Sequence, residues 1–152
     1  GQAALANFKS SGRQADVVRA LAQALVARGV PRSSIGVIAP YRAHVAAVRQ
    51  RLAGAGLAEV LVDTVDRFQG GERAVMILAF GLEQPPTAGP HGADFLGDPN
   101  RLNVALTRAQ RKLVLVGNRQ ALAAVPLLER LLRHCERLYG GVGGVVRVGA
   151  PV

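Results

Sequence analysis

Apolar residues recur along the chain with two different spacings, and segments of the two kinds alternate. Over residues 14–28 they return every three or four positions, which predicts a helix that Gly29 and Pro31 terminate. Residues 42–53 repeat this pattern, and residues 119–138 predict one or two closing helices. A shorter segment with a different apolar pattern lies next to each helical one. This alternation predicts that helices and strands follow one another along the chain.

The shorter segments are continuous apolar runs, which suit strands buried on both faces of a parallel sheet. The runs are Ile35–Ala39, Val60–Thr64, Val75–Phe80 and Leu113–Val116. A further helix is predicted over residues 98–109, because Asp98 is a good N-cap residue and Pro99 suits the first helical position. Strands that alternate with helices predict an α/β domain with a parallel sheet, right-handed crossovers and helices on both faces.

The length of 152 residues fits one domain. We assign residues 13–139 to it, with residues 1–12 as a lead-in and the glycine-rich residues 140–152 as a flexible tail. Residues 83–94 (EQPPTAGPHGAD) are rich in proline and glycine, which predicts an exposed loop.

The chain carries 19 basic and 10 acidic residues, a formal charge of +9. All the basic residues except Lys9 and Lys112 are arginines, whose planar guanidinium binds phosphate through two hydrogen bonds. The excess favours an anionic partner, with nucleic acid first, although codon bias in a chain rich in Ala, Arg and Gly explains it equally well. A single cysteine, Cys135, excludes an internal disulfide bond, and no run suits a membrane span or a signal peptide. We therefore expect a cytoplasmic location without a membrane partner.

In open parallel sheets, ligands bind beyond the carboxyl ends of the strands. The polar residues that follow the predicted strands are expected to gather there, on one edge of the sheet. The sequence lacks a GxxxxGK[ST] phosphate loop, a GxGxxG fingerprint, an HExxH pair and a CxxC pair, and its three histidines are too scattered to indicate a metal site. The chain is therefore not expected to hold a triphosphate and magnesium by itself.

Three stretches in order carry a resemblance to a known family. IGVIAPYRAHVAAV, TVDRFQGGERAVMIL and NRLNVALTRAQRKLVLVGN resemble motifs IV, V and VI of the superfamily 1 helicases. FQGGE is the version of the branch that contains the RNA-surveillance helicases and their DNA-acting relatives, superfamily 1B. The likeness runs from about Ser11 to about Tyr139. It implies the second RecA-like domain, a fold of the P-loop NTPase type with three αβα layers.

The resemblance also implies roles for individual residues. Arg108, in the LTRA element, corresponds to the arginine finger that stabilises charge on the γ-phosphoryl group, and the helix over residues 98–109 is expected to present it rigidly. The residues implied to bind ATP are Glu72, Gly71, Gln69, Arg13 and Arg101. The residues implied to contact nucleic acid are Thr64, Pro40, Tyr41, Arg42 and Asn103. ATP and Mg²⁺ would be held mainly by an N-terminal RecA-like domain, which this chain does not contain.

Other interpretations of these residues stay open. Arg101 is equally compatible with bracing a loop, and we favour a local surface pair between Asp66 and Arg67 over a functional role for either. Five positions depart from the family pattern, namely Gly12, Gln14, His44, Asn100 and Leu82. These departures leave the strength of unwinding open, while the finger and FQGGE are intact.

Three hypotheses follow for function. The first is an ATP-driven helicase or translocase, for which the resemblance implies 5′ to 3′ movement on single-stranded DNA or RNA. The second, motivated by the departures, is a degenerate RecA-like domain that binds nucleic acid or protein without ATPase activity. The third is a flavodoxin-like enzyme of small molecules, for which the sequence shows no self-sufficient pocket.

Overall fold

Four parallel strands form the sheet at the centre of the fold in the computed structural model, which describes residues 11–68, 71–84 and 98–139. The strands are β1 (Ile35–Ile38), β2 (Leu61–Asp63), β3 (Arg73–Ala79) and β4 (Ala109–Val116), in the spatial order β2-β1-β3-β4. Each of the four predicted apolar runs contributes to one strand. The predicted parallel sheet is therefore confirmed.

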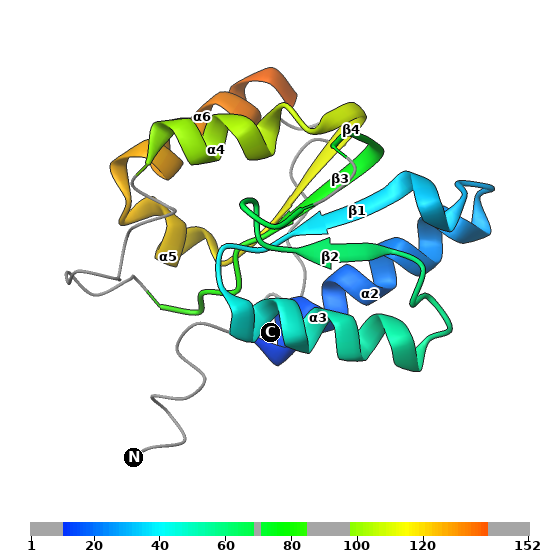
Figure 1. The fold of residues 1–152 in the computed structure, drawn as a ribbon. Coiled ribbons are helices and arrows are strands. Elements are labelled where there is room, and N and C mark those ends of the chain that lie inside the picture. The colour runs from blue at the N-terminus through cyan, green and yellow to red at the C-terminus, as the bar shows by residue number, and fades with distance from the viewer. Residues whose placement is uncertain (1–10, 69–70, 85–97, 140–152) are drawn as a thin grey trace, which may run out of the picture.

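Helices cover both faces of this sheet and give the predicted three-layer, RecA-like α/β architecture (Figure 1). One face is covered by α2 (Gly12–Ala27) and α3 (Arg42–Gly54). The other is covered by α4 (Pro99–Leu106), α5 (Arg119–Ala123) and α6 (Pro126–Tyr139), while a short 3₁₀ turn, η1 (Arg32–Ser34), leads into β1.

The core consists of two apolar layers, one on each face of the sheet. Val37 and Ile77 point toward α2 and α3, whereas Ile38 and Met76 point toward the other helices, since successive strand residues face opposite sides. All four residues of β1 are buried, as expected for a central strand.

The ends of the helices follow their capping residues. The Ser11 hydroxyl accepts a hydrogen bond of 3.0 Å from the Gln14 amide, so α2 begins two residues before the predicted start. Asp98 caps α4 as predicted, through a 2.9 Å bond from the Asn100 amide. The prolonged helix predicted over residues 98–109 is wrong, because α4 ends at Leu106.

Strand β4 begins where that helix was expected to continue. Gln110, Arg111 and Lys112 are exposed, so no apolar pattern marks them as strand, yet they extend the ladder with β3 as far as the pair Arg73–Ala109. The Thr107 hydroxyl bonds the carbonyl groups of Asn103 and Val104 and completes the last turn of α4.

Three predicted segments fall wholly or partly outside the described residues. They are the lead-in up to residue 10, the loop over 83–94 beyond Gln84, and the tail over 140–152. Among the described residues, no helix is long and apolar enough to cross a membrane.

Candidate functional site

Two of the three motif V residues predicted to bind ATP, Gly71 and Glu72, lie beside the predicted finger at the amino-terminal ends of two paired strands. Glu72 and Arg108 immediately precede β3 and β4, and the Arg73 amide donates a hydrogen bond of 3.0 Å to the Arg108 carbonyl. Gly71 has φ +67°, and a Cβ added there would lie 3.9 Å from Arg108 Nη1. The structure thus brings Gly71, Glu72 and Arg108 together. Gln69 lies outside the described residues.

Arg108 occupies the turn between α4 and β4 rather than the helix itself. Its amide donates a 3.3 Å bond to the Ala105 carbonyl, and its own carbonyl belongs to the β3–β4 ladder. The predicted presentation from a helix over residues 98–109 is therefore wrong, because the sheet fixes this backbone from one side and the end of α4 fixes it from the other. Its side chain is half-buried.

Glu72 has a side-chain partner on the neighbouring strand. Gln110 Nε2 donates a hydrogen bond of 3.3 Å to Glu72 Oε2, and both side chains are exposed. Sequence reasoning missed Gln110, since only the pairing of β3 with β4 brings position 110 next to position 72. The carboxylate is held at the rim of the sheet, where it remains able to accept further hydrogen bonds.

The residues predicted to contact nucleic acid lie mainly at the opposite, carboxyl end of the sheet. Pro40, Tyr41 and Arg42 follow β1, and Thr64 follows β2, whose last residue Asp63 pairs with Ile38. Tyr41 packs on the core beside α4–α6, Arg42 is exposed, and the Thr64 amide bonds the Asp63 carboxylate at 2.8 Å. The expectation that all polar residues gather on one edge is therefore wrong.

The two groups of candidate residues lie at opposite ends of the sheet. The connections that lead into β3 and β4 return the chain to the amino end, because parallel strands all start there. Strand β3 alone spans roughly 20 Å at ~3.3 Å per residue. Arg13, on the first turn of α2, lies at the carboxyl end, since its neighbour Gln14 bonds the Leu82 carbonyl at 2.7 Å. The structure does not bring Arg13 beside Arg108, and Asn103 is exposed on α4.

Residues 64–72 connect the two ends in the sequence, and we call them the crossover segment, of which the structure describes residues 64–68 and 71–72. It runs from the end of β2 to the start of β3, with β1 between them in the sheet. Phe68 lies over β1 at Gly36, where an added Cβ would be 2.7 Å from Phe68 Cζ. The Arg73 guanidinium stands 5.3 Å from the centre of the same ring, a cation–π distance. Sequence reasoning missed both contacts of Phe68.

Arg101 lies between two carboxylates. Its Nη2 is 3.6 Å from Asp66 Oδ2 in the crossover segment, and its Nε is 3.8 Å from Asp98 Oδ2 at the start of α4. The favoured local pair of Asp66 with Arg67 is therefore wrong, because the turn over residues 65–67 directs the carboxylate to α4 instead. The alternative that Arg101 braces a loop matches this geometry, while its predicted contact with ATP stays a prediction.

Several departures from the family pattern pack into one polar cluster at the carboxyl end of β3. The Gln14 side chain donates to the Leu82 carbonyl and accepts a 3.0 Å bond from the Gly81 amide. His44 is buried against Gly81, and its Nδ1 accepts from the Ser11 amide at 3.4 Å. Three of the five departing residues, Gln14, His44 and Leu82, thus belong to the same packed and hydrogen-bonded cluster. Asn100 is exposed on α4, and Gly12 begins α2.

Glu83 closes this cluster. The Ser11 hydroxyl donates a short hydrogen bond to one oxygen of its carboxylate, and Asn118 Nδ2 donates a 3.5 Å bond to the other. Burial lowers the pKa of His44 from 6.5 to about 4, and the Glu83 charge opposes this effect only in part. His44 is consequently neutral near pH 7, a state that the sequence alone did not indicate.

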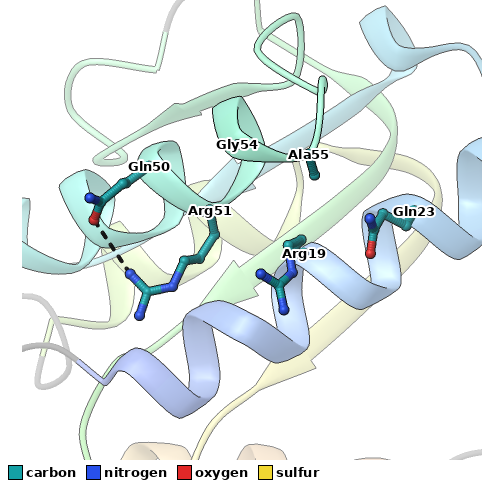
Figure 2. A pocket seen from close by; sticks show the side chains of 6 residues that line it. All are labelled: Arg19, Gln23, Gln50, Arg51, Gly54 and Ala55. Carbon is teal, nitrogen blue, oxygen red and sulfur yellow. Dashed lines mark hydrogen bonds between the residues drawn. The ribbon is translucent and has the colours of Figure 1, made fainter.

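One groove among the described residues is lined by none of the predicted site residues. It runs between α2 and α3 and is lined by Arg19, Gln23, Gln50, Arg51, Gly54 and Ala55 (Figure 2). Asp16 pairs with Arg51 there at 3.1 Å and with Arg19 at 3.6 Å, so one carboxylate partly neutralises two arginines. A second hollow, at Leu61, Asp63, Asp66, Arg67 and Phe68, adjoins the crossover segment.

Comparisons with known proteins agree on one family. Residues 4–120 match the family described as AAA domain. The DNA replication ATP-dependent helicase/nuclease DNA2 of Bos taurus is 37% identical over 122 residues, which are 80% of this chain and 11% of that protein. The Regulator of nonsense transcripts 1 homolog of Arabidopsis thaliana is 39% identical over 123 residues, which are 77% of this chain and 10% of that protein.

The 3'-5' exoribonuclease HELZ2 of Homo sapiens is a third relative, 36% identical over 131 residues that cover 80% of this chain and 4% of that protein. The chain therefore spans about a tenth or less of the length of these three curated relatives.

Proposed function

Because the chain belongs to the AAA domain family, and within it to the superfamily 1 helicases of the 1B type, we propose that it is the C-terminal motor domain of an ATP-dependent helicase or translocase. The observation that carries the proposal is the juxtaposition of Gly71, Glu72 and Arg108 at the adjacent starts of β3 and β4. A glycine with positive φ, a carboxylate and a guanidinium meet at one rim, which we assign to a nucleotide held by another domain.

Arg108 is assigned to the γ-phosphoryl group. Charge on its oxygens must be stabilised as the transition state forms, and a guanidinium on a fixed backbone does this without reorganisation. The ladder bond from Arg73 and the end of α4 fix that backbone. Glu72 is assigned to a hydroxyl or guanidinium donor near the nucleotide, and Gln110 keeps its carboxylate at the rim.

The rest of the ATP site is assigned to an N-terminal RecA-like domain. Bound Mg²⁺ would neutralise phosphate charge during transfer. In the described part of the chain, no three His, Cys, Asp or Glu side chains stand close enough together to hold a metal ion.

A single strand of DNA or RNA is assigned to the carboxyl end of the sheet. Pro40, Tyr41 and Arg42 follow β1 there, beside Thr64. Contacts of such residues with phosphate and sugar fix position without reading sequence, and an aromatic ring adds about 1–3 kcal/mol per stacked base. Movement in the 5′ to 3′ direction is the expectation for this branch.

The crossover segment connects the residues assigned to the single strand with the residues assigned to the nucleotide. It begins at Thr64 beside Tyr41 and ends at Glu72 beside Arg108, and Phe68 anchors its middle on β1. This continuity supports coupling between the strand and the nucleotide.

A comparison of the chain with the full-length protein tests the proposal. The chain alone is expected to show no ATP turnover, whereas the full-length protein hydrolyses ATP faster when a single strand is present. Affinity for a single strand, measured at one salt concentration, should differ with and without a non-hydrolysable ATP analogue. A full-length protein that binds the strand equally under both conditions and never hydrolyses ATP would instead be the degenerate binding domain.

A further inference from the structure

Two motif segments that are far apart in the sequence are joined through one guanidinium. Arg101 lies on α4 and contacts Asp66 of the crossover segment at 3.6 Å and Asp98, the N-cap of its own helix, at 3.8 Å. The guanidinium of Arg101 therefore lies between a carboxylate of its own helix and a carboxylate of the crossover segment. The bridge ties the middle of the crossover segment to α4.

Helix α4 leads from this bridge to the turn that bears the predicted finger. Arg101 and Arg108 are separated by the body of α4 and its final turn, and Leu102 and Ala105 of that helix are buried against the sheet. A short, capped and packed helix moves as a rigid unit, so a displacement of the crossover segment at Asp66 would act on the α4 side of the turn that bears Arg108, while the β3–β4 ladder holds its other side.

Stability alone gives little reason for this contact. The side chains of Arg101 and Asp66 are 43% and 62% exposed, and ion pairs this exposed contribute about 0–1 kcal/mol. A geometric role fits better. The planar guanidinium contacts the two carboxylates through different nitrogens, whereas the charge of a lysine is concentrated on one nitrogen.

We propose that Asp66 is a positioning residue which, through Arg101, sets the relation between the crossover segment and helix α4, whose end leads into the turn that bears the predicted finger, and so transmits occupation by a single strand to the ATP site. The inference rests on the proposed function. Asp66 itself touches neither the nucleotide nor the strand in this account.

The test measures ATP turnover of the full-length protein with and without a single strand for Asp66→Asn and Asp66→Glu. The stimulation ratio is the turnover with a single strand divided by the turnover without one. Asp66→Asn should leave basal turnover unchanged and lower this ratio roughly three- to tenfold, within the range typical of mutations that change coupling. Asp66→Glu keeps the charge and should restore most of that ratio. The double variant Asp66→Asn with Arg101→Gln should show no greater loss of stimulation than Arg101→Gln alone, because the two residues act through one contact.

Asp16→Asn is the matched control. Asp16 also pairs with an arginine of a neighbouring element, Arg51 at 3.1 Å, but on the face covered by α2 and α3. The stimulation ratio of the Asp16→Asn variant should equal that of the unmodified protein. An equal loss in both variants, an unchanged ratio in Asp66→Asn, or a parallel fall of basal and stimulated turnover would each overturn the inference.

Failure of the inference is distinguishable from failure of the proposed function. If the full-length protein shows no turnover that responds to a single strand, the proposed function fails and the inference falls with it. If turnover responds and requires Arg108, while Asp66→Asn behaves as the unmodified protein, only the inference is wrong.

Discussion

The amide of Arg73 donates a hydrogen bond to the carbonyl of Arg108, which makes the backbone of the predicted finger part of the β3–β4 ladder. Arg73 also places its guanidinium over Phe68, which lies on β1 at Gly36. One residue thus contacts both the finger and the crossover segment.

Gly36→Ala should destabilise the chain by about 1–3 kcal/mol, the usual cost of overpacking a tight site. The added Cβ would lie 2.7 Å from Phe68 Cζ and 2.9 Å from Arg73 Cγ, so the crossover segment has to move. Urea unfolding measures the loss. Gly54→Ala is the control, since no atom lies within 4 Å of the added Cβ there, and a similar loss in both variants would contradict the packing of Phe68 on β1.

Gly81→Ala should cost more than Gly29→Ala. Both glycines have positive φ, +77° and +95°, so both substitutions carry a backbone penalty of about 1–2 kcal/mol. At Gly81 the new Cβ would also lie 2.6 Å from His44 Cγ, whereas at Gly29 the space is open. The difference between the two unfolding free energies therefore isolates the contact with His44, and equal losses would show that this contact is not tight.

Acid should weaken the fold through His44. Its pKa is about 4 in the folded chain and 6.5 in the unfolded one, so the unfolded state binds more protons between these values. The contribution of neutral His44 is complete above pH 6.5 and is lost as the pH falls toward 4, a difference of about 3 kcal/mol. Unfolding free energies of the chain and of His44→Gln across this range measure it. Curves that stay parallel would contradict the burial of a neutral imidazole.

The sequence alone predicted much of the fold. Continuous apolar runs such as Ile35–Ala39 mark buried strands, and Asp98 followed by Pro99 marks a helix start, because both signals are local. The exposed start of β4 carries no such signal, so the extent of α4 was overestimated and Arg108 was placed on a helix rather than in a turn.

The sequence named candidate residues for the site but did not show how they are arranged in the fold. The motif resemblance named Glu72 and Arg108, and the ladder between β3 and β4 brings them together. That same ladder sends them to the opposite end of the sheet from Tyr41, which sequence order does not reveal. The contact between Asp66 and Arg101 depends on where the turn over residues 65–67 points, a property of the folded sheet.

Arg108→Ala in the full-length protein tests the central claim most directly. Turnover of ATP should fall by roughly 10³–10⁵-fold, the usual worth of an arginine finger, while affinity for ATP changes far less. Arg111→Ala is the control, because Arg111 is an exposed arginine on β4 close to the same turn, and its turnover should be unchanged. Near-normal turnover in the Arg108 variant would contradict the account.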